Sequence, residues 1–229
     1  RTFSSAASDV YKRQVVKAGV FSFLMVVVYI IGPDYLLQSK ASNWLVWLSS
    51  FTILTASIIA ISKDDLKARL AYSTISQLSY IILGAALATT FALKGASFHI
   101  ITHALGKITL FFCAGAIYVT AHVKKISELG GLGFKTPMIF FAYTLGALSI
   151  IGVPPLIGSW SKLFLVIGSL EADFLFVAIL LGISSLLNIY YLLQPVFIAF
   201  DKKNIKNINI TKAPLTIWPP VITGVGCLF

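Results

Sequence analysis

Charged residues are scarce in this chain of 229 residues, and acidic residues are scarcer than basic ones. Asp, Glu, Lys and Arg make up 11% of the sequence, with 8 acidic against 18 basic side chains, whereas soluble domains carry about 25% charged residues. The mean hydropathy is +0.90, and 58% of the residues are hydrophobic. These values exclude a soluble globular fold and predict an all-α polytopic membrane protein.

Several kinds of functional site are also missing from the sequence. Cys113 and Cys227 both lie in apolar stretches, so neither a disulfide framework nor a Cys metal cluster can be built from them. The net charge of +10 does not indicate a nucleic-acid partner, because the basic residues form no basic face with interleaved aromatics. The sequence has no Walker A loop, dinucleotide fingerprint or Gly-x-Ser-x-Gly elbow. We expect no catalytic centre, metal or cofactor in this chain.

About seven stretches of the chain meet or approach the length of roughly 20 apolar residues that a spanning helix needs. They cover residues 15–32, 44–62, 66–90, 96–122, 137–170, 174–200 and 214–229. Residues 1–14 are polar and do not match the apolar run after them, which is typical of a linker, a processing remnant or a sequence artefact. The chain starts without Met and stops within an apolar run, so we expect a fragment whose transmembrane domain covers residues 15–229.

The loops between these stretches alternate in charge. The basic residues after the second, fourth and sixth stretches are Lys63, Lys67, Arg69, Lys124, Lys125, Lys135, Lys202, Lys203, Lys206 and Lys212. The loops on the other side hold only Lys40 and Lys94. The positive-inside rule therefore predicts that the Lys-rich loops are cytoplasmic. As the membrane, we expect the inner or plasma membrane of a bacterial or archaeal cell.

Three protonatable residues, His99, His103 and Lys107, stand four positions apart in the apolar stretch 96–122. On a helix they climb about 12 Å along one side, and ionisable residues inside a membrane usually mark an ion or proton pathway. The alternative is that the histidines only hydrogen-bond neighbouring helices. Zinc is not favoured, because the His pair has neither the Glu of zincins nor a third ligand nearby.

The stretch 137–170 contains two adjacent prolines, Pro154 and Pro155, between Gly152 and Gly158. Two missing backbone donors predict a broken helix, and transporters use such breaks at their ion sites. Lys162 follows seven residues after Pro155. The competing interpretation is a packing kink followed by a lysine that reaches the membrane surface.

A polar stripe runs along the stretch 66–90. Ser73, Ser76, Gln77 and Tyr80 have the i, i+3, i+4, i+7 spacing of one helix face. We expect this face to point into the bundle and to support the protonatable residues, although helix packing explains it equally well.

Lys17, Lys107 and Lys162 fall within predicted spans, whereas every acidic residue lies outside the spans or at their ends. A lysine at the centre of a spanning helix costs about 2.5–3.5 kcal/mol on insertion scales. The rest of a longer protein could supply the compensating acids. Lys17 reaches the membrane surface if its helix begins at Val15, and lies in mid-membrane if the native helix is longer.

Three motifs in this order resemble the antiporter-like membrane subunits shared by respiratory complex I and the Mrp-type multisubunit Na+/H+ antiporters. They are the run Asp65–Gln77, the pattern His99-x3-His103-x3-Lys107, and Gly152-x-Pro-Pro leading to Lys162. The run His103–Ile117, followed by Glu128–Gly131, looks closest to the D-type subunit of the Mrp antiporters. The resemblance extends from about Val15 to the end of the chain.

The resemblance implies that the chain corresponds to the second half of a fourteen-helix fold with two inverted five-helix repeats. Lys17 then matches the central lysine of helix eight, Lys107 and the two histidines match helix eleven, and Lys162 matches the exit lysine on broken helix twelve. It implies a proton-translocating subunit of a monovalent cation (Na+)/H+ antiporter, with other membrane subunits and the lipid bilayer as partners.

Two alternatives stay open. One is an L/M/N-type proton-pumping subunit of NADH:quinone oxidoreductase (complex I), which would make the chain part of a translocase. The other is a membrane scaffold that moves no ion.

Overall fold

The computed structural model describes residues 18–38, 41–201 and 216–228, and it places helix in each of the seven predicted stretches. Four helices are long and apolar enough to cross a membrane: α3 (Ala41–Ser62), α4 (Leu66–Leu87), α5 (Thr90–Ala121) and α9 (Leu175–Ala199). Two shorter apolar helices cover Ala18–Ile31 and α7 (Pro137–Ile151). The predicted all-α membrane class is confirmed.

The remaining elements are short or flank the break. They are the π-helical end η1 (Val26–Ile31) of the first helix, α2 (Pro33–Gln38), the 3-10 turn η2 (Ile126–Glu128), α6 (Leu132–Lys135), α8 (Ile157–Glu171) and α10 (Trp218–Val225). The predicted stretch 137–170 is therefore two helices, α7 and α8, and the predicted break at Pro154 and Pro155 is confirmed.

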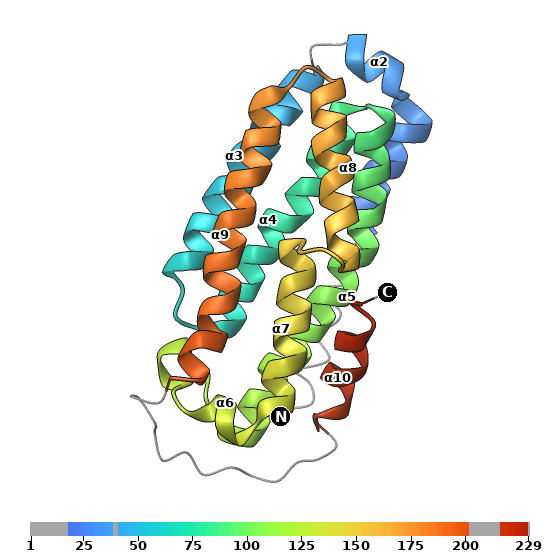
Figure 1. The fold of residues 1–229 in the computed structure, drawn as a ribbon. Coiled ribbons are helices and arrows are strands. Elements are labelled where there is room, and N and C mark those ends of the chain that lie inside the picture. Colours follow the sequence, from blue (N-terminus) through green and yellow to red (C-terminus); the bar gives the residue numbers. More distant parts are fainter. Residues whose placement is uncertain (1–17, 39–40, 202–215, 229) are drawn as a thin grey trace.

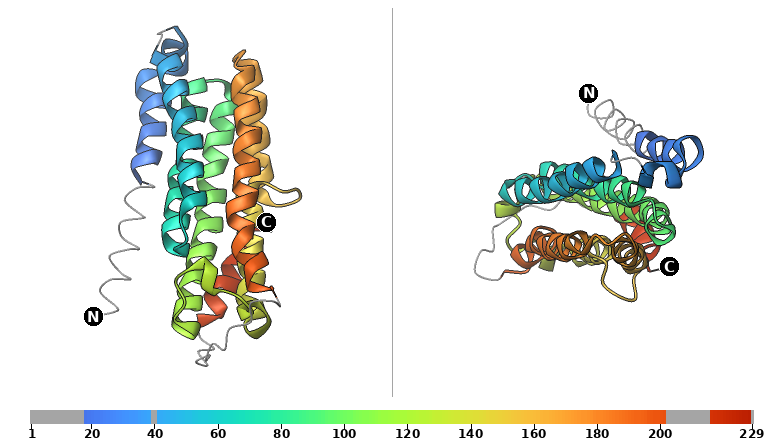
Figure 2. Two further views of the ribbon diagram at one scale, coloured as in Figure 1. Left: turned by 90° about the vertical axis from the view of Figure 1, so that its left-hand side faces the viewer. Right: turned by 90° about the horizontal axis from the view of Figure 1, so that it is seen from above.

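The long helices form two layers (Figures 1 and 2). Seen from above, α3, α4 and α5 make one layer, and α9 makes the other with α7 and α8. Both halves of the broken helix pack on α5, while α3 packs beside α9. The segment between α7 and α8 bulges away from its layer, and α10 packs on α5 and α7 near one end of the bundle. This arrangement places α5 against both halves of the broken helix.

Local sequence explains where α4 and α5 begin and end. The side chain of Asp65 accepts a hydrogen bond of 2.8 Å from the amide of Ala68, and Thr89 does the same for Ala92 at 3.3 Å. Both are N-caps that satisfy a free amide in the first helical turn. Ala88 (φ 53°) and His122 (φ 55°) take the left-handed conformation that ends α4 and α5.

Two of the Lys-rich loops lie at the same end of the bundle and are joined to each other. The carboxylate of Asp64 accepts hydrogen bonds from the amide (3.0 Å) and the hydroxyl (2.8 Å) of Ser127. Backbone bonds from Ile126 to Asp64 (2.8 Å) and from Leu66 to Lys124 (3.0 Å) complete the contact. The bonds from Ser127 lower the pKa of Asp64, with a further contribution from the positive charge of Lys125.

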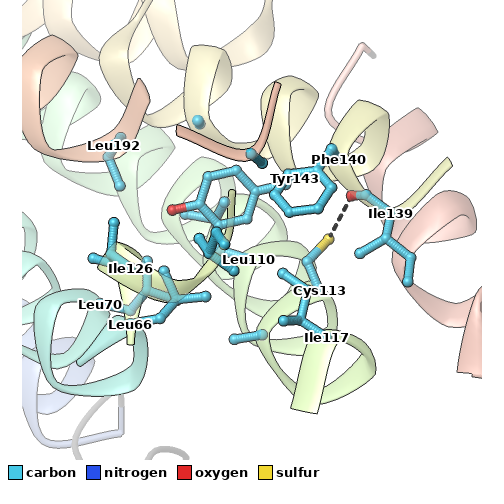
Figure 3. Packing of buried hydrophobic residues seen from close by; sticks show 14 of the residues in the cluster. Leu66, Leu70, Leu110, Cys113, Ile117, Ile126, Ile139, Phe140, Tyr143 and Leu192 are labelled. Atoms are coloured by element: carbon cyan, nitrogen blue, oxygen red, sulfur yellow. Dashed lines mark hydrogen bonds between the residues drawn. The ribbon is translucent and has the colours of Figure 1, made fainter. Parts of the chain in front are cut away.

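A hydrophobic cluster fills the same end of the bundle (Figure 3). Phe140 and Tyr143 of α7 pack against Leu110 and Cys113 of α5 and against residues of α4. The thiol of Cys113 donates to the carbonyl of Ile139 at 3.4 Å. Cys113 and Cys227 are both buried free thiols. This cluster fixes the first half of the broken helix against α5.

Candidate functional site

The helix α5 buries all three predicted protonatable residues. His99, His103 and Lys107 are each 2% exposed. The rings of His99 and His103 lie nearly parallel, with centroids 6.0 Å apart and an interplanar angle of 17°. Since each residue is one helical turn from the next, the three side chains form a row on one side of α5.

Lys107 contacts α4 at the predicted polar stripe. Its Nζ donates to the hydroxyl of Ser73 and, at 3.3 Å, to the carbonyl of Leu70. Ser73 itself donates to the carbonyl of Leu70 at 3.0 Å. An ammonium has three donors and no acceptor, so Lys107 matches this group of oxygen atoms.

His99 connects α5 to α8 through Ser161. The distance from Nδ1 of His99 to Oγ of Ser161 is 3.0 Å, and the Ser161 hydroxyl lies 2.9 Å from the carbonyl of Gly158. A carbonyl cannot donate, so the single Ser161 proton goes to Gly158 and the hydrogen-bond network assigns the other proton to Nδ1 of His99. This assignment leaves the lone pair on Nε2, which makes no hydrogen bond among the described residues, while the backbone of Gln77 interacts with the ring.

Lys162 lies on α8 just beyond the break and reaches back to the end of α7. Its Nζ donates to the carbonyl of Ile151 at 2.8 Å and to the hydroxyl of Ser185 at 3.1 Å. In an unbroken helix the N–H of residue 155 would bond the carbonyl of residue 151, but Pro155 has none. Lys162 therefore satisfies a carbonyl that the break leaves without a partner.

Two glycines allow the chain to pass the break. Gly152 (φ 86°) donates to the carbonyl of Ser149, and Val153 donates to that of Leu148, which is the Schellman pattern of a helix end. A Cβ on Gly158 would stand 1.7 Å from the carbonyl oxygen of Ser149. The backbones of α7 and α8 approach closely only because this position has no side chain.

Tyr80 lies between His99 of α5 and Lys162 of α8. Its ring stacks on the ring of His99, with centroids 5.4 Å apart, and the ammonium of Lys162 lies 5.3 Å from its centroid. The hydroxyl approaches Ser184 and Asn188 of α9 without reaching hydrogen-bond geometry. Tyr80, predicted to support the row, is thus in direct contact with two of its members.

The other predicted members of the polar stripe have different surroundings. The hydroxyl of Ser76 lies 2.9 Å from that of Ser57 and 3.1 Å from the carbonyl of Ile53, so Ser76 joins α4 to α3. The side-chain amide of Gln77 is fully buried, and neither of its polar atoms has a hydrogen-bond partner among the described residues. Lys17 lies outside the described residues, so its predicted role stays a prediction.

Two groups of polar residues were not predicted from the sequence. Arg69, expected among the loop charges, is buried at 4% exposure inside the bundle. Ser185, Asn188 and Tyr191 of α9 face the row, and the hydroxyl of Tyr191 donates to Asn188 at 2.5 Å. The spacing of Ser184, Asn188 and Tyr191 in the sequence is that of one helix face and could have indicated them.

The family model for NADH:quinone oxidoreductase/Mrp antiporter transmembrane proteins matches residues 13–188. The chain is 42% identical over 157 residues to NADH-quinone oxidoreductase subunit N of Desulforudis audaxviator, covering 68% of this chain and 31% of that protein. It is 32% identical over 207 residues to subunit L of Mycobacterium tuberculosis, covering 86% of this chain and 32% of that protein. The chain thus spans about a third of the length of these relatives.

Two solved structures share the fold. A chain of the Mrp complex from Dietzia sp. DQ12-45-1b superposes with a TM-score of 0.82 at 21% identity, covering 93% of this chain and 47% of that one. A chain of respiratory complex I from Thermus thermophilus gives 0.79 at 22% identity, covering 92% and 44%. From its sequence match and its fold, the chain belongs to the NADH:quinone oxidoreductase/Mrp antiporter transmembrane family.

Proposed function

We propose that this chain forms the proton-translocating part of an antiporter-like membrane subunit, with Lys107 as central proton acceptor, His103 and His99 as relays and Lys162 as exit site. The observation that supports the proposal best is the link between His99 and the broken helix. Buried side chains of α5 connect to α8, beyond the helix break, through the contact of His99 with Ser161 and the position of Tyr80 between His99 and Lys162.

The chemistry of His99 fits a relay. A proton that binds the lone pair at Nε2 converts the ring to imidazolium, in which both nitrogens donate. Release of the proton on Nδ1 to the Ser161 oxygen, as the Ser161 hydroxyl passes its own proton to a neighbouring water, then restores a neutral ring, so the proton moves across the imidazole from α5 toward α8. The Nζ of Lys162 lies over the Tyr80 ring that stacks on His99, and it takes up this proton from the water when its amine is neutral and carries a lone pair.

Buried polar atoms on α4 and α9 supply places for such water. Gln77, the hydroxyls of Tyr80 and Ser184, and Nδ2 of Asn188 are buried without hydrogen-bond partners among the described residues. A buried polar group without a partner is costly, and buried water normally makes two to four hydrogen bonds to such groups. Water bound at these atoms would hydrate the row, as transport requires, whereas the scaffold alternative requires a dry interface.

Two assemblies remain as candidates for the complete protein. The runs His103–Ile117 and Glu128–Gly131 favour the D-type subunit of an Mrp antiporter, which would exchange Na+ for protons. The names of the relatives at 42% and 32% identity favour a complex I subunit. Purification of the full-length protein with its native partners, together with transport assays with and without Na+, separates the two.

The proposal extends to the membrane orientation and to Lys17. The loops at 63–65 and 122–131 meet at one end of the bundle, which agrees with the alternation predicted from charge, and we place this end in the cytoplasm of a prokaryotic cell. Lys17 would be the entry point of the row. Other membrane subunits, the lipid bilayer and protons are the expected partners.

The decisive variant is Lys107→Ala in the full-length protein within its assembled complex. We expect proton transport into liposomes, followed by a pH-sensitive dye, to stop while the amount of assembled complex is unchanged. Lys94→Ala, which changes an exposed lysine on the same helix, is the matched control. Transport by Lys107→Ala at the parental rate would overturn the assignment of the row.

A further inference from the structure

Arg69 is a buried cation that the proton row does not use. Its guanidinium donates through Nε to the carbonyl of Lys63 (2.9 Å) and through Nη2 to that of Ile61 (3.3 Å). Nη1 donates to the carbonyl of Tyr191 (3.3 Å) and to Oε1 of Gln194 (2.6 Å). One side chain of α4 is therefore bonded to the end of α3 and to the C-terminal half of α9.

The backbone carbonyls that Arg69 binds are those that lack ordinary helical partners. Since α3 ends at Ser62, the carbonyl of Ile61 is in the last turn and that of Lys63 lies beyond it, where no further helical amide follows. The carbonyl of Tyr191 would normally bond the N–H of residue 195. Residue 195 is a proline inside α9, which has no N–H and whose ring also pushes that carbonyl outward.

The Tyr191 carbonyl is close to the polar face of α9. The hydroxyl of Tyr191 donates to Asn188, and Ser185, one turn before Asn188, accepts from Lys162. On α4, Ser73 lies one turn after Arg69 and accepts from Lys107. Arg69 thus joins α4 and α9 near one end of each helix. These two helices hold Ser73, the partner of Lys107, and Ser185, the partner of Lys162.

Arginine suits this position for two reasons. Its planar guanidinium carries five donors in a fixed arrangement, so it can bind several carbonyls at once. It also keeps its charge at all physiological pH values, so these contacts do not change when protons pass through neighbouring groups. A lysine would offer three donors on a single nitrogen and could exchange its own proton.

We propose that Arg69 is a positioning residue that replaces the amide missing at Pro195, and so holds the polar face of α9 in register with α4 along the lysine and histidine row. This inference rests on the proposed function. It assigns no proton-carrying role to Arg69 itself.

The test is a double-mutant cycle between Arg69 and Pro195 in the full-length protein within its assembled complex. Arg69→Gln replaces the five charged donors of the guanidinium with a shorter, neutral amide, and Pro195→Ala restores an amide opposite the Tyr191 carbonyl. We expect Arg69→Gln to slow proton transport by about tenfold or more, the factor that corresponds to losing a hydrogen bond from a charged donor. Pro195→Ala alone should transport near the parental rate, and the double variant should recover a large part of the loss.

A second readout separates positioning from general damage. Hydrogen exchange of the amides of residues 188–194 should speed up in Arg69→Gln and slow again in the double variant. Lys67→Gln, which changes an exposed lysine two residues earlier on α4, is the matched control and should change neither exchange nor transport. If Arg69→Gln fails to assemble, Arg69→Lys takes its place in the same cycle with the same expected rescue.

Two outcomes overturn the inference. Parental transport by the Arg69 variant would show that the hydrogen bonds of Arg69 are unnecessary for transport. Equal rates for the Arg69 variant and the double variant would show that Arg69 does not compensate for the amide missing at Pro195. Lys107→Ala tests the proposed function independently. If that variant stops transport while the Arg69 cycle shows no coupling, only the positioning role is wrong.

Discussion

The Nζ of Lys162 donates a hydrogen bond of 2.8 Å to the carbonyl of Ile151, across the break between α8 and α7. Pro155 leaves that carbonyl without a helical partner. The side chain proposed as the proton exit therefore also holds the end of α7. Any change of its position would alter the geometry of the break.

Lys162→Met should loosen this helix end as well as stop transport. The carbonyl of Ile151 would lose its charged donor, which lowers the free energy of local opening by about 1–3 kcal/mol. Hydrogen exchange of the Gly152 and Val153 amides, which close the end of α7, should accelerate accordingly. Lys94→Met serves as the control, and unchanged exchange at both amides would contradict the contact.

Two substitutions of Tyr80 separate the contribution of its ring to transport from that of its hydroxyl. Tyr80→Phe keeps the stacking on His99 and the contact with the Lys162 ammonium, whereas Tyr80→Leu removes both; a buried cation–π contact contributes about 2 kcal/mol. We expect Tyr80→Phe to transport faster than Tyr80→Leu, as measured in liposomes. Equal loss in the two variants would mean that the hydroxyl, not the ring, is what the row requires.

Gly158→Ala should destabilise the protein strongly. The new Cβ would lie 1.7 Å from the carbonyl oxygen of Ser149, and overpacking against backbone costs about 3 kcal/mol or more. Gly115→Ala is the matched control, because nothing lies within 4 Å of its Cβ position and alanine favours a helix by up to about 1 kcal/mol. Thermal unfolding of the purified complex measures both, and similar midpoints would argue against the close approach of α7 and α8.

The contact between Asp64 and Ser127 should depend on pH. The hydrogen bonds from Ser127 hold the pKa of Asp64 below the ordinary value for an aspartate, so the carboxylate favours the folded state. That contribution is complete above the unfolded pKa and disappears as the pH falls through the lower folded pKa. We expect the Ser127 amide to lose its protection from hydrogen exchange in strongly acidic buffer.

Asp64→Asn is the control for this loop contact. It removes the titrating group, so exchange at Ser127 should be faster at neutral pH and should lack the acid-dependent step seen in the parental protein. A parental acid-dependent step in the variant would assign the transition to another group.

The fold was predictable where hydrophobic runs are long or where a covalent feature interrupts them. Scarce charge and apolar runs of helical length indicated a helical membrane protein, and Pro154 with Pro155 indicated the break. The row on α5 was predictable for another local reason. The positions of His99, His103 and Lys107 on one side of a helix follow from helical periodicity alone.

Contacts between helices were not predictable in this way. Arg69 looked like one of the loop charges because it follows Lys63 and Lys67 closely, and only the packing of α3, α4 and α9 places it against three backbone carbonyls. Tyr80 and Ser76 share one predicted stripe, but a helix face is wide enough for two neighbours. Tyr80 therefore meets His99 and Lys162, whereas Ser76 meets α3.

The sequence by itself determined the membrane class, the helix break and the order of protonatable residues along α5, because hydropathy, proline geometry and helical periodicity are local properties. Only the tertiary structure decided that His99 meets Ser161, that Tyr80 lies between His99 and Lys162, and that cations bind the carbonyls freed by Pro155 and Pro195. Those partners lie on different helices, and which faces come together depends on the packing of all the helices at once.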